Sequence, residues 1–464
     1  MARLLAFRGL VSSSSSSTPH LRHHHDSLVR IVALGVGSLD DMVAALDRSG
    51  VPVNQDSLNA VIDTCKTEAG DGGSGSGRRL LRFFSWCLPR VPQEHLGDDV
   101  FNRAIRAFAA MKDLTAMGIA ISRLHEERRM MTLETFTLVS DTLVKSGEEE
   151  DAVRLFRGLV RARLLQIPDG GGEGASRGLL VMVHALCARG HAGMARGVVW
   201  RHRRNLLSGG GEATRIIQQS LLHGWCVRGD VKEARHVMDE MKSLGFPPTI
   251  ASYNDLLLCL CQKNVKSNPS ALVPEATNLM TEMRTSGVPA ATASFNILLS
   301  SLSRVRRAKE ACRILYLMQQ GEAECSPDWA SYHIVIRLMY LTGRFVRGDR
   351  LLKEMLEAGL LPGTSFYHSL VGLLCGLEKV DHALQTFDQM KRCGQYNAPT
   401  YELLIEKLSR SGRFEQATNL WEEATERNVI LQCSRDLLDP SKTEVFKPVA
   451  AEKKLRSQSY SKVS

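Results

Sequence analysis

Long apolar runs are missing from this sequence of 464 residues. The longest uncharged stretches, such as residues 178–188, fall well short of the roughly 18 apolar residues that a membrane helix needs. The 37 glycines and 15 prolines follow no collagen period. Because 44% of the residues are hydrophobic and 23% are charged, we expect a folded protein that does not span a membrane.

Motifs of catalysis and of metal binding are also missing. The sequence holds no phosphate loop ending in Lys-Ser/Thr, no HExxH, no GxSxG and no His-x-Glu followed by Pro-Cys-x-x-Cys. Cys259 and Cys261 alone do not complete a tetrahedral metal site. Eleven scattered cysteines without a CxxC indicate free thiols in a reducing compartment. We therefore expect a protein that is not an enzyme and that uses no cofactor and no metal.

Positive charge is in excess, because 59 Lys and Arg residues face 50 Asp and Glu residues, a balance of +9. Such a surplus favours polyanions, either nucleic acid or an anionic membrane surface. Charge alone does not choose between them.

The N-terminus is typical of an organelle transit peptide. Arg3 and Arg8 lie among apolar residues, six serines follow, and no acid occurs before Asp26. We predict a transit peptide over residues 1–38 and a lead-in segment over 39–54. The amphipathic order of the first ten residues favours the mitochondrion, with the plastid as the second choice. The alternative is a tail that lacks acids and has no targeting role.

The rest of the chain repeats itself, a property that decides the fold class. Four aromatic residues are each followed by an alanine 16 residues later: Phe136, Phe295, Tyr367 and Tyr401, with Ala152, Ala311, Ala383 and Ala417. Glycine recurs 11 residues after the aromatic position, at Gly147, Gly343 and Gly412, and in the same register at Gly190 and Gly229. This spacing predicts a helix that opens near the aromatic, a turn at the glycine, and a second helix that carries the alanine.

Ten such units of about 35 residues fill the range 55–432 and predict an all-α stack of helix pairs. We place them at 55–97, 98–132, 133–175, 176–214, 215–249, 250–291, 292–328, 329–363, 364–397 and 398–432. The extra residues of the longer units form tracts rich in Gly, Ser or Pro that we expect to be loops, at 70–77, 169–174, 208–212 and 266–272. Residues 433–464 form a basic tail.

Two kinds of recurring residue are predicted to pack in the core. A cysteine occupies the twelfth position of four units, at Cys187, Cys226, Cys261 and Cys375. The aromatic stripe from Phe101 to Tyr401 recurs one residue before the fifth position. We expect its rings to pack between helices and not to stack on nucleic-acid bases.

Segments such as SYNDLLLCLC, KEACRILYLM and KEARHVMDEMKSLGFPP resemble the pentatricopeptide repeat family. The resemblance covers residues 55–432 and is closest to the pure-repeat class of plant mitochondria. The tetratricopeptide family has a similar period, but its Trp-x-x-Leu-Gly signature is missing here. The resemblance implies a right-handed α-solenoid superhelix that binds single-stranded RNA, one base per repeat, without catalysis.

In the family, the residues at the fifth and last positions of a repeat read the base. Asn296 with Asp328 is the best match, a pair that the resemblance associates with uracil. Less complete matches place further candidate readers at Asn254, Asn102, Thr132, Thr137, His333, His368 and Asn397. The second position, usually valine in the family, is small or proline here, at Ala251, Ala293, Ala330, Ser365 and Pro399.

Basic residues recur at the thirteenth or fourteenth position, where the first helix of a unit ends. As contacts for RNA phosphates we name Lys145, Arg189, Arg228, Lys263, Arg304 and Arg410. A cation beside a helix C-terminus is also favoured by the helix dipole alone, and that explanation stays open.

We therefore expect a single-stranded RNA-binding protein of organelle RNA metabolism, which affects processing, stability, splicing or translation of a transcript by occupying it. Its partners would be organelle RNA and either the organelle ribosome or RNA-processing proteins, and the protein itself would be a monomer. The alternative is a helical scaffold for proteins, such as a component of the organelle ribosome, that has lost its base-reading residues.

Overall fold

The structure is a computed structural model that describes residues 27–33, 37–68, 76–92, 96–166, 174–202, 210–321 and 325–442. Most of the predicted transit peptide and most of the predicted basic tail lie outside these ranges. The chain divides into two compact units, residues 1–259 and 260–464. Each unit is described by itself.

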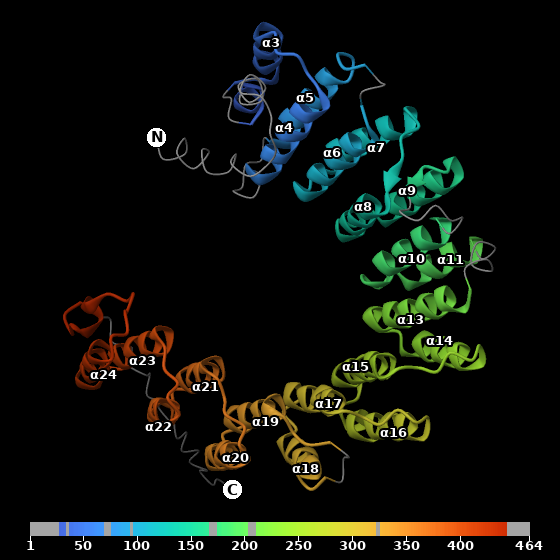
Figure 1. The fold of residues 1–464 in the computed structure, drawn as a ribbon. Coiled ribbons are helices and arrows are strands. Elements are labelled where there is room, and N and C mark those ends of the chain that lie inside the picture. The colour runs from blue at the N-terminus through green and yellow to red at the C-terminus, as the bar shows by residue number, and fades with distance from the viewer. Residues whose placement is uncertain are drawn as a thin grey trace, which may run out of the picture. The chain divides into compact units, whose positions relative to one another are not determined.

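The first unit is a series of helix pairs (Figure 1). In the first five pairs, the opening helices contact one another in sequence, and each also contacts the second helix of its own pair. The opening helices are α4 (Gln55–Glu68), α6 (Asp98–Ala110), α8 (Leu133–Lys145), α10 (Gly174–Cys187), α13 (Gly210–Arg228) and the start of α15 (Ile250–Ser267). The second helices are α5 (Ser76–Cys87), α7 (Leu114–Glu126), α9 (Glu149–Ala162), α11 (Ala192–Arg201) and α14 (Val231–Ser243), and α3 (Leu39–Ser49) precedes them all.

The second unit continues the same pattern. Its opening helices follow one another in one row, and the second helices lie in a row beside them (Figure 1). The opening helices are α17 (Thr292–Arg304), α19 (Trp329–Leu341), α21 (Thr364–Gly376) and α23 (Ala398–Arg410). The second helices are α16 (Leu272–Thr285), α18 (Ala308–Gln319), α20 (Phe345–Glu357), α22 (Val380–Arg392) and α24 (Phe414–Glu426), with short 3₁₀ turns η3 (Pro269–Ala271) and η4 (Arg435–Leu438).

The predicted all-α solenoid of helix pairs is confirmed. Within the described ranges, the one sheet consists of two short parallel strands, β1 (Met131–Thr132) and β2 (Leu165–Gln166), which join the segments before α8 and after α9. None of the helices in these ranges is long and apolar enough to span a membrane.

In eight of the nine helix pairs whose turns the structure describes, the turn depends on one residue in the left-handed backbone region. The five predicted turn glycines all have positive φ, from +72° at Gly343 to +86° at Gly229. Where the glycine is absent, the equivalent residues Lys112, Arg306 and Glu378 adopt the same conformation, with φ between +56° and +59°. Glycine is therefore the favoured residue here, since any other pays a steric cost for its Cβ.

One pair has no such turn. In α15 the equivalent position is Asn264, which is buried and donates from Nδ2 to Glu275 Oε2 on α16 at 2.8 Å. The helix continues to Ser267, and the chain then reverses through the 3₁₀ turn at Pro269. The prediction of a loop over 266–272 was therefore wrong at both ends, because residues 266–267 belong to α15 and residue 272 begins α16. The inserted residues lengthen α15 and add the 3₁₀ turn.

The glycine tracts were also predicted to be loops throughout, and this was wrong where helices begin inside them. Helix α13 begins at Gly210, five residues before the predicted start of its repeat, and α10 begins at Gly174. The Phe246 ring lies against Gly211, close enough that an added Cβ would touch it at 3.7 Å. The helix therefore begins among glycines in spite of their low helix propensity.

The recurring aromatic and cysteine residues form the core, as predicted. Phe101, Phe136, Tyr253, Tyr332, Tyr367 and Tyr401 are buried, whereas Phe295 is half-buried. The four cysteines at the twelfth position are buried as well, and burial raises the pKa of the Cys261 and Cys375 thiols to about 11. All eleven cysteines are free.

Small residues on the second helices are buried for a steric reason. Ala152, Ala311, Ala383 and Ala417 are all fully buried. Gly348 takes the same place in α20, where an added Cβ would collide with the ring of Tyr340. Tyr340 fills that space and donates to Asp349 Oδ1 at 2.7 Å.

The turn geometry predicts the effect of Gly343→Ala. No atom lies within 4 Å of an added Cβ at Gly343, so the only cost is the left-handed backbone, which we expect to lower the free energy of unfolding by about 1 kcal/mol. Urea unfolding of the purified chain measures it. The matched variant Lys112→Gly relieves the same strain and should change stability by less than about 0.5 kcal/mol in either direction. Equal decreases in stability in the two variants would contradict the assignment.

Candidate nucleic-acid interface

The start of α19 brings together the two residues of the best predicted base-reading pair. Asp328 is the N-cap of α19, and Asn296 lies one turn into α17. Asn296 Nδ2 donates to Asp328 Oδ1 at 3.1 Å, and both side chains are half-buried. The fifth residue of one repeat and its last residue are thus in contact across two helices, with part of each facing solvent.

Ser331 is the third member of this cluster and lies on its buried side. Its hydroxyl is buried and lies 2.6 Å from Asn296 Oδ1 and 2.9 Å from Asp328 Oδ1, and its backbone N–H donates to the same Asp328 oxygen at 2.8 Å. Burial acts to raise the pKa of Asp328. The hydrogen bonds from Ser331 and Asn296 outweigh it and hold the pKa below its ordinary value, so the carboxylate is ionised at neutral pH.

Sequence reasoning named the fifth and last positions and missed the third. A Ser or Thr occupies the third position of six repeats and is buried in each, at Ser57, Thr135, Ser252, Ser294, Ser331 and Thr400. In several repeats it contacts the cap residue before it, as in Thr132 Oγ1 to Thr135 Oγ1 at 2.8 Å. The recurrence of this hydroxyl was visible in the sequence and would have indicated that the last residue of a repeat caps the next helix.

Asn102 and Thr132 also meet, but in a different environment. Asn102 is only 1% exposed, and its Nδ2 donates to the carbonyls of Asp98 and Met130 at 2.8 Å. Its Oδ1 accepts from the backbone N–H of Thr132 at 2.9 Å. The Asn102 amide thus hydrogen-bonds both the first turn of α6 and the segment that precedes α8.

His368 and Asn397 are joined through a third side chain. His368 Nδ1 lies 2.9 Å from Thr400 Oγ1, which lies 2.5 Å from Asn397 Oδ1. Asn397 is the N-cap of α23, just as Asp328 is the N-cap of α19. The same three positions therefore form a cluster in both repeats.

The other candidate readers hold the same position, the fifth of the repeat, in their own opening helices. His333 is half-buried, with Nε2 2.9 Å from Ser369 Oγ. Thr137 is exposed, and its hydroxyl donates to the carbonyl of Leu133 at 2.8 Å. Asn254 is half-buried on α15.

All six predicted phosphate contacts are exposed at the ends of opening helices. Two of them have acidic partners one turn earlier: Lys145 Nζ lies 2.5 Å from Asp141, and Arg410 lies 2.6 Å from Glu406. Arg228 lies over the Trp225 ring at 5.3 Å. Exposed pairs of this kind are weak, so these side chains can turn toward another anion at small cost.

Two histidines of opening helices, His223 in α13 and His333 in α19, have pKa values shifted in opposite directions. His223 Nδ1 lies 2.9 Å from Asp255 Oδ2, and this hydrogen bond, against the effect of burial, raises the pKa of His223 above its ordinary value of 6.5. Burial, assisted by the nearby charge of Arg337, lowers the pKa of His333. At neutral pH His333 is therefore uncharged.

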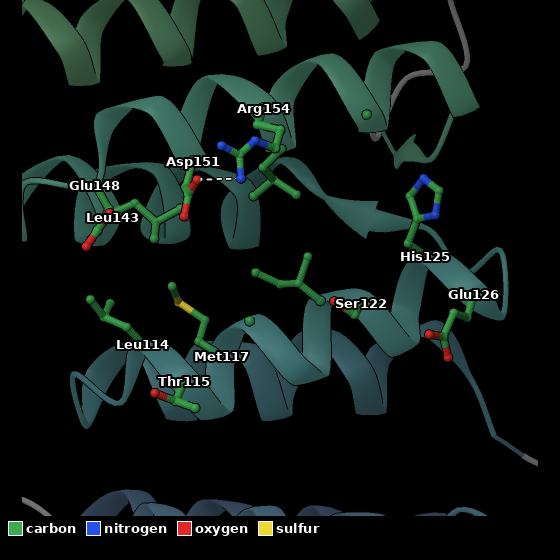
Figure 2. Close-up of a pocket in the computed structure, with 14 residues that line it drawn as sticks. Leu114, Thr115, Met117, Ser122, His125, Glu126, Leu143, Glu148, Asp151 and Arg154 are labelled. Carbon is green, nitrogen blue, oxygen red and sulfur yellow. Dashed lines mark ion pairs between the residues drawn. The ribbon is translucent and has the colours of Figure 1, made fainter.

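A cavity of about 620 Å³ lies away from these residues, between the second helices α7 and α9 (Figure 2). Met117 and Leu114 line it from α7, and the ion pair of Asp151 with Arg154, at 2.9 Å, lines it from α9. None of the predicted RNA-contacting residues takes part in it.

Comparison with known proteins gives matches over most of the chain. The PPR repeat family model matches residues 219–262, and the PPR repeat model matches residues 293–321, 365–395 and 399–429. A mitochondrial pentatricopeptide repeat-containing protein of Arabidopsis thaliana is 42% identical over 458 residues, which cover 96% of this chain and 89% of that protein.

Two further matches are more distant. The small ribosomal subunit protein mL104 (rPPR9) of Arabidopsis thaliana is 29% identical over 79% of this chain and 67% of its own length. The solved structure of the pentatricopeptide repeat protein PPR10 in complex with an 18-nt psaJ RNA element is 18% identical, with a TM-score of 0.44, and covers 91% of this chain and 64% of that chain.

The His223–Asp255 contact predicts a pH dependence. A raised folded-state pKa means that the contact stabilises the fold fully below the ordinary histidine value near 6.5, and that this contribution disappears as the pH rises through the raised value. We expect Asp255→Asn to lower the midpoint of the His223 imidazole titration, followed by NMR. Asp239→Asn removes an exposed carboxylate from α14 and should leave that midpoint unchanged. An unchanged midpoint in Asp255→Asn would contradict the contact.

Proposed function

This chain belongs to the pentatricopeptide repeat family and to its class built from repeats alone, and from that premise we propose that it binds single-stranded RNA in the mitochondrion. It acts in mitochondrial RNA metabolism by occupying a transcript. The mitochondrial relative at 42% identity, which this chain matches over nearly its whole length, supports the compartment.

One observation carries the proposal: the cluster of Asn296, Asp328 and Ser331 at the adjoining starts of α17 and α19. It combines a half-exposed amide, which donates and accepts, with an ionised carboxylate, which accepts only. Complementary groups occur on the Watson–Crick edge of an unstacked base. A buried serine holds both side chains, so the edge that they present is fixed before RNA arrives.

The electrostatics of the opening helices agree with this function. Exposed cations stand where these helices end, and the candidate readers stand near where they begin. A strand that lies across the row can thus meet polar groups with its bases and positive charge with its phosphates. Binding alone then acts on the RNA, because a bound segment is closed to nucleases and cannot pair with another strand.

A second function is a protein-binding scaffold in the mitochondrial ribosome. The 29% identity to a small ribosomal subunit protein favours it, as do the repeats whose fifth and last positions lack a matched polar pair, such as Leu180 with Thr214. The two functions differ in what ribonuclease does to the partners of the protein.

The deciding experiment is crosslinking and immunoprecipitation of the tagged protein from purified mitochondria, with and without ribonuclease. We expect a narrow RNA footprint, and we expect most co-purified proteins to dissociate after ribonuclease. A fixed set of protein partners that survives ribonuclease, without a footprint, would instead establish the scaffold.

Two substitutions test the reading pair without unfolding the site. Asp328→Asn keeps the N-cap, because Asn caps helices as well as Asp, but it replaces a carboxylate oxygen by a donor. Asn296→Ser removes the amide. We expect each to weaken binding to the footprint RNA about 5- to 100-fold, the effect of removing one hydrogen-bonded side chain from a base, in a fluorescence anisotropy titration.

Asp239→Ala is the control for these substitutions, because it removes an exposed carboxylate from the second helix α14. It should bind as the unchanged protein does. If all three variants bind equally well, these residues do not read a base.

The row of cations predicts a salt dependence. Lys263→Gln with Arg304→Gln should reduce the slope of log affinity against log salt by about 0.7 for each phosphate that is no longer neutralised. The charge-matched control is Arg347→Gln with Lys353→Gln on the second helix α20, where both side chains are exposed. Slopes that fall equally in both double variants would mean that only net charge matters, not its position.

A further inference from the structure

Trp329 is a large apolar side chain left in solvent beside the candidate reading pair. It is the first residue of α19 and follows the cap residue Asp328 directly. Its side chain is 56% exposed, although the other residues of this helix turn their apolar side chains inward, as Tyr332 and Ile336 do. Burying an indole of this size would release considerable free energy, so its exposure needs an explanation.

The indole is the outer member of a row of three neighbouring rings. Its centroid lies 6.5 Å from that of His333, with 27° between the planes, and the His333 ring lies 4.8 Å from that of Phe366, tilted by 48°. Phe366 is buried in α21, and His333 lies 2.9 Å from Ser369 Oγ. The row therefore runs from the core outward and supports the indole on one side.

The surroundings of the indole are small or positively charged. Ala330 follows it in α19 and offers only a methyl group. Arg337 lies two turns further along α19 on the side of Trp329 and His333, and it is exposed. An exposed flat apolar ring with a cation further along the same helix face suits single-stranded nucleic acid, with a base on the ring and a phosphate on the cation.

We propose that Trp329 is a stacking platform for one RNA base, placed next to the base that Asn296 and Asp328 contact. This proposal rests on the proposed function, since it adds an interaction with the same RNA. Stacking on an aromatic ring is available to every base, so Trp329 supplies affinity, whereas Asn296 and Asp328 supply the choice of base.

The test uses the full-length protein and a fluorescein-labelled uridine dodecamer in anisotropy titrations. We expect Trp329→Ala to weaken binding about 5- to 100-fold and Trp329→Phe, which keeps a ring, to weaken it much less. The salt slope should stay the same, because every phosphate keeps its cation. Thermal unfolding of both variants checks that α19 is intact.

Two controls separate stacking from other effects. Tyr316→Ala removes a side chain that is also 56% exposed but lies on the second helix α18, and it should bind as the unchanged protein does. A ribose-phosphate dodecamer without bases should bind the unchanged protein and Trp329→Ala equally well. Tryptophan fluorescence gives a second readout. The difference between the spectra of the unchanged protein and Trp329→Phe is the emission of Trp329, and RNA should quench it.

Three outcomes would overturn the proposal, and they are distinguishable. If the unchanged protein binds the dodecamer and Trp329→Ala binds it equally well, the platform is wrong while the RNA-binding function stands. If the unchanged protein binds neither this dodecamer nor its footprint RNA, both the stacking platform and the RNA-binding function are wrong. If Trp329→Ala binds RNA as the unchanged protein does but loses a protein partner that survives ribonuclease, the indole binds that protein and not RNA.

Discussion

The hydrogen bonds that cap the opening helices decide where the candidate readers stand. In the repeats that begin at Trp329 and Ala398, the first helix starts from an Asp or Asn that belongs to the repeat before it. A buried hydroxyl two residues into the helix binds that cap residue and also meets the fifth-position side chain of the preceding repeat. Folding one repeat thus positions the polar groups of its neighbour.

The turn inside each pair is the second constraint, and it acts on the backbone. One left-handed residue reverses the chain between two helices of 13 or so residues, and the identity of that residue is secondary to its φ. Lys112, Arg306 and Glu378 accept the conformation at a steric cost that packing of the two helices offsets. Among the pairs whose turns the structure describes, α15 alone has no left-handed turn residue, because it continues through Asn264 and reverses at Pro269.

The sequence predicted the helix pairs because their spacing is repeated, so that four aromatic and alanine pairs support one another even where single repeats are degenerate. It did not predict that α13 begins at Gly210, because glycine is a poor helix former and the Phe246 ring that packs on Gly211 comes from the far end of the pair. The resemblance singled out Asn296 and Asp328 as a pair, but the contact between their side chains is seen only in the structure. The neighbouring rings of Trp329, His333 and Phe366 were not predicted, since Phe366 reaches them from another repeat.

In the proposed function, an incoming base must replace the bonds that Asn296, Asp328 and Ser331 already make with one another. A base whose edge can take over these bonds exchanges one set for another at little cost. A base whose edge cannot leaves a buried hydroxyl or an ionised carboxylate without its partner, a penalty larger than the gain from any single new hydrogen bond. Discrimination at such a site comes less from attraction to the right base than from the penalty imposed on the wrong one.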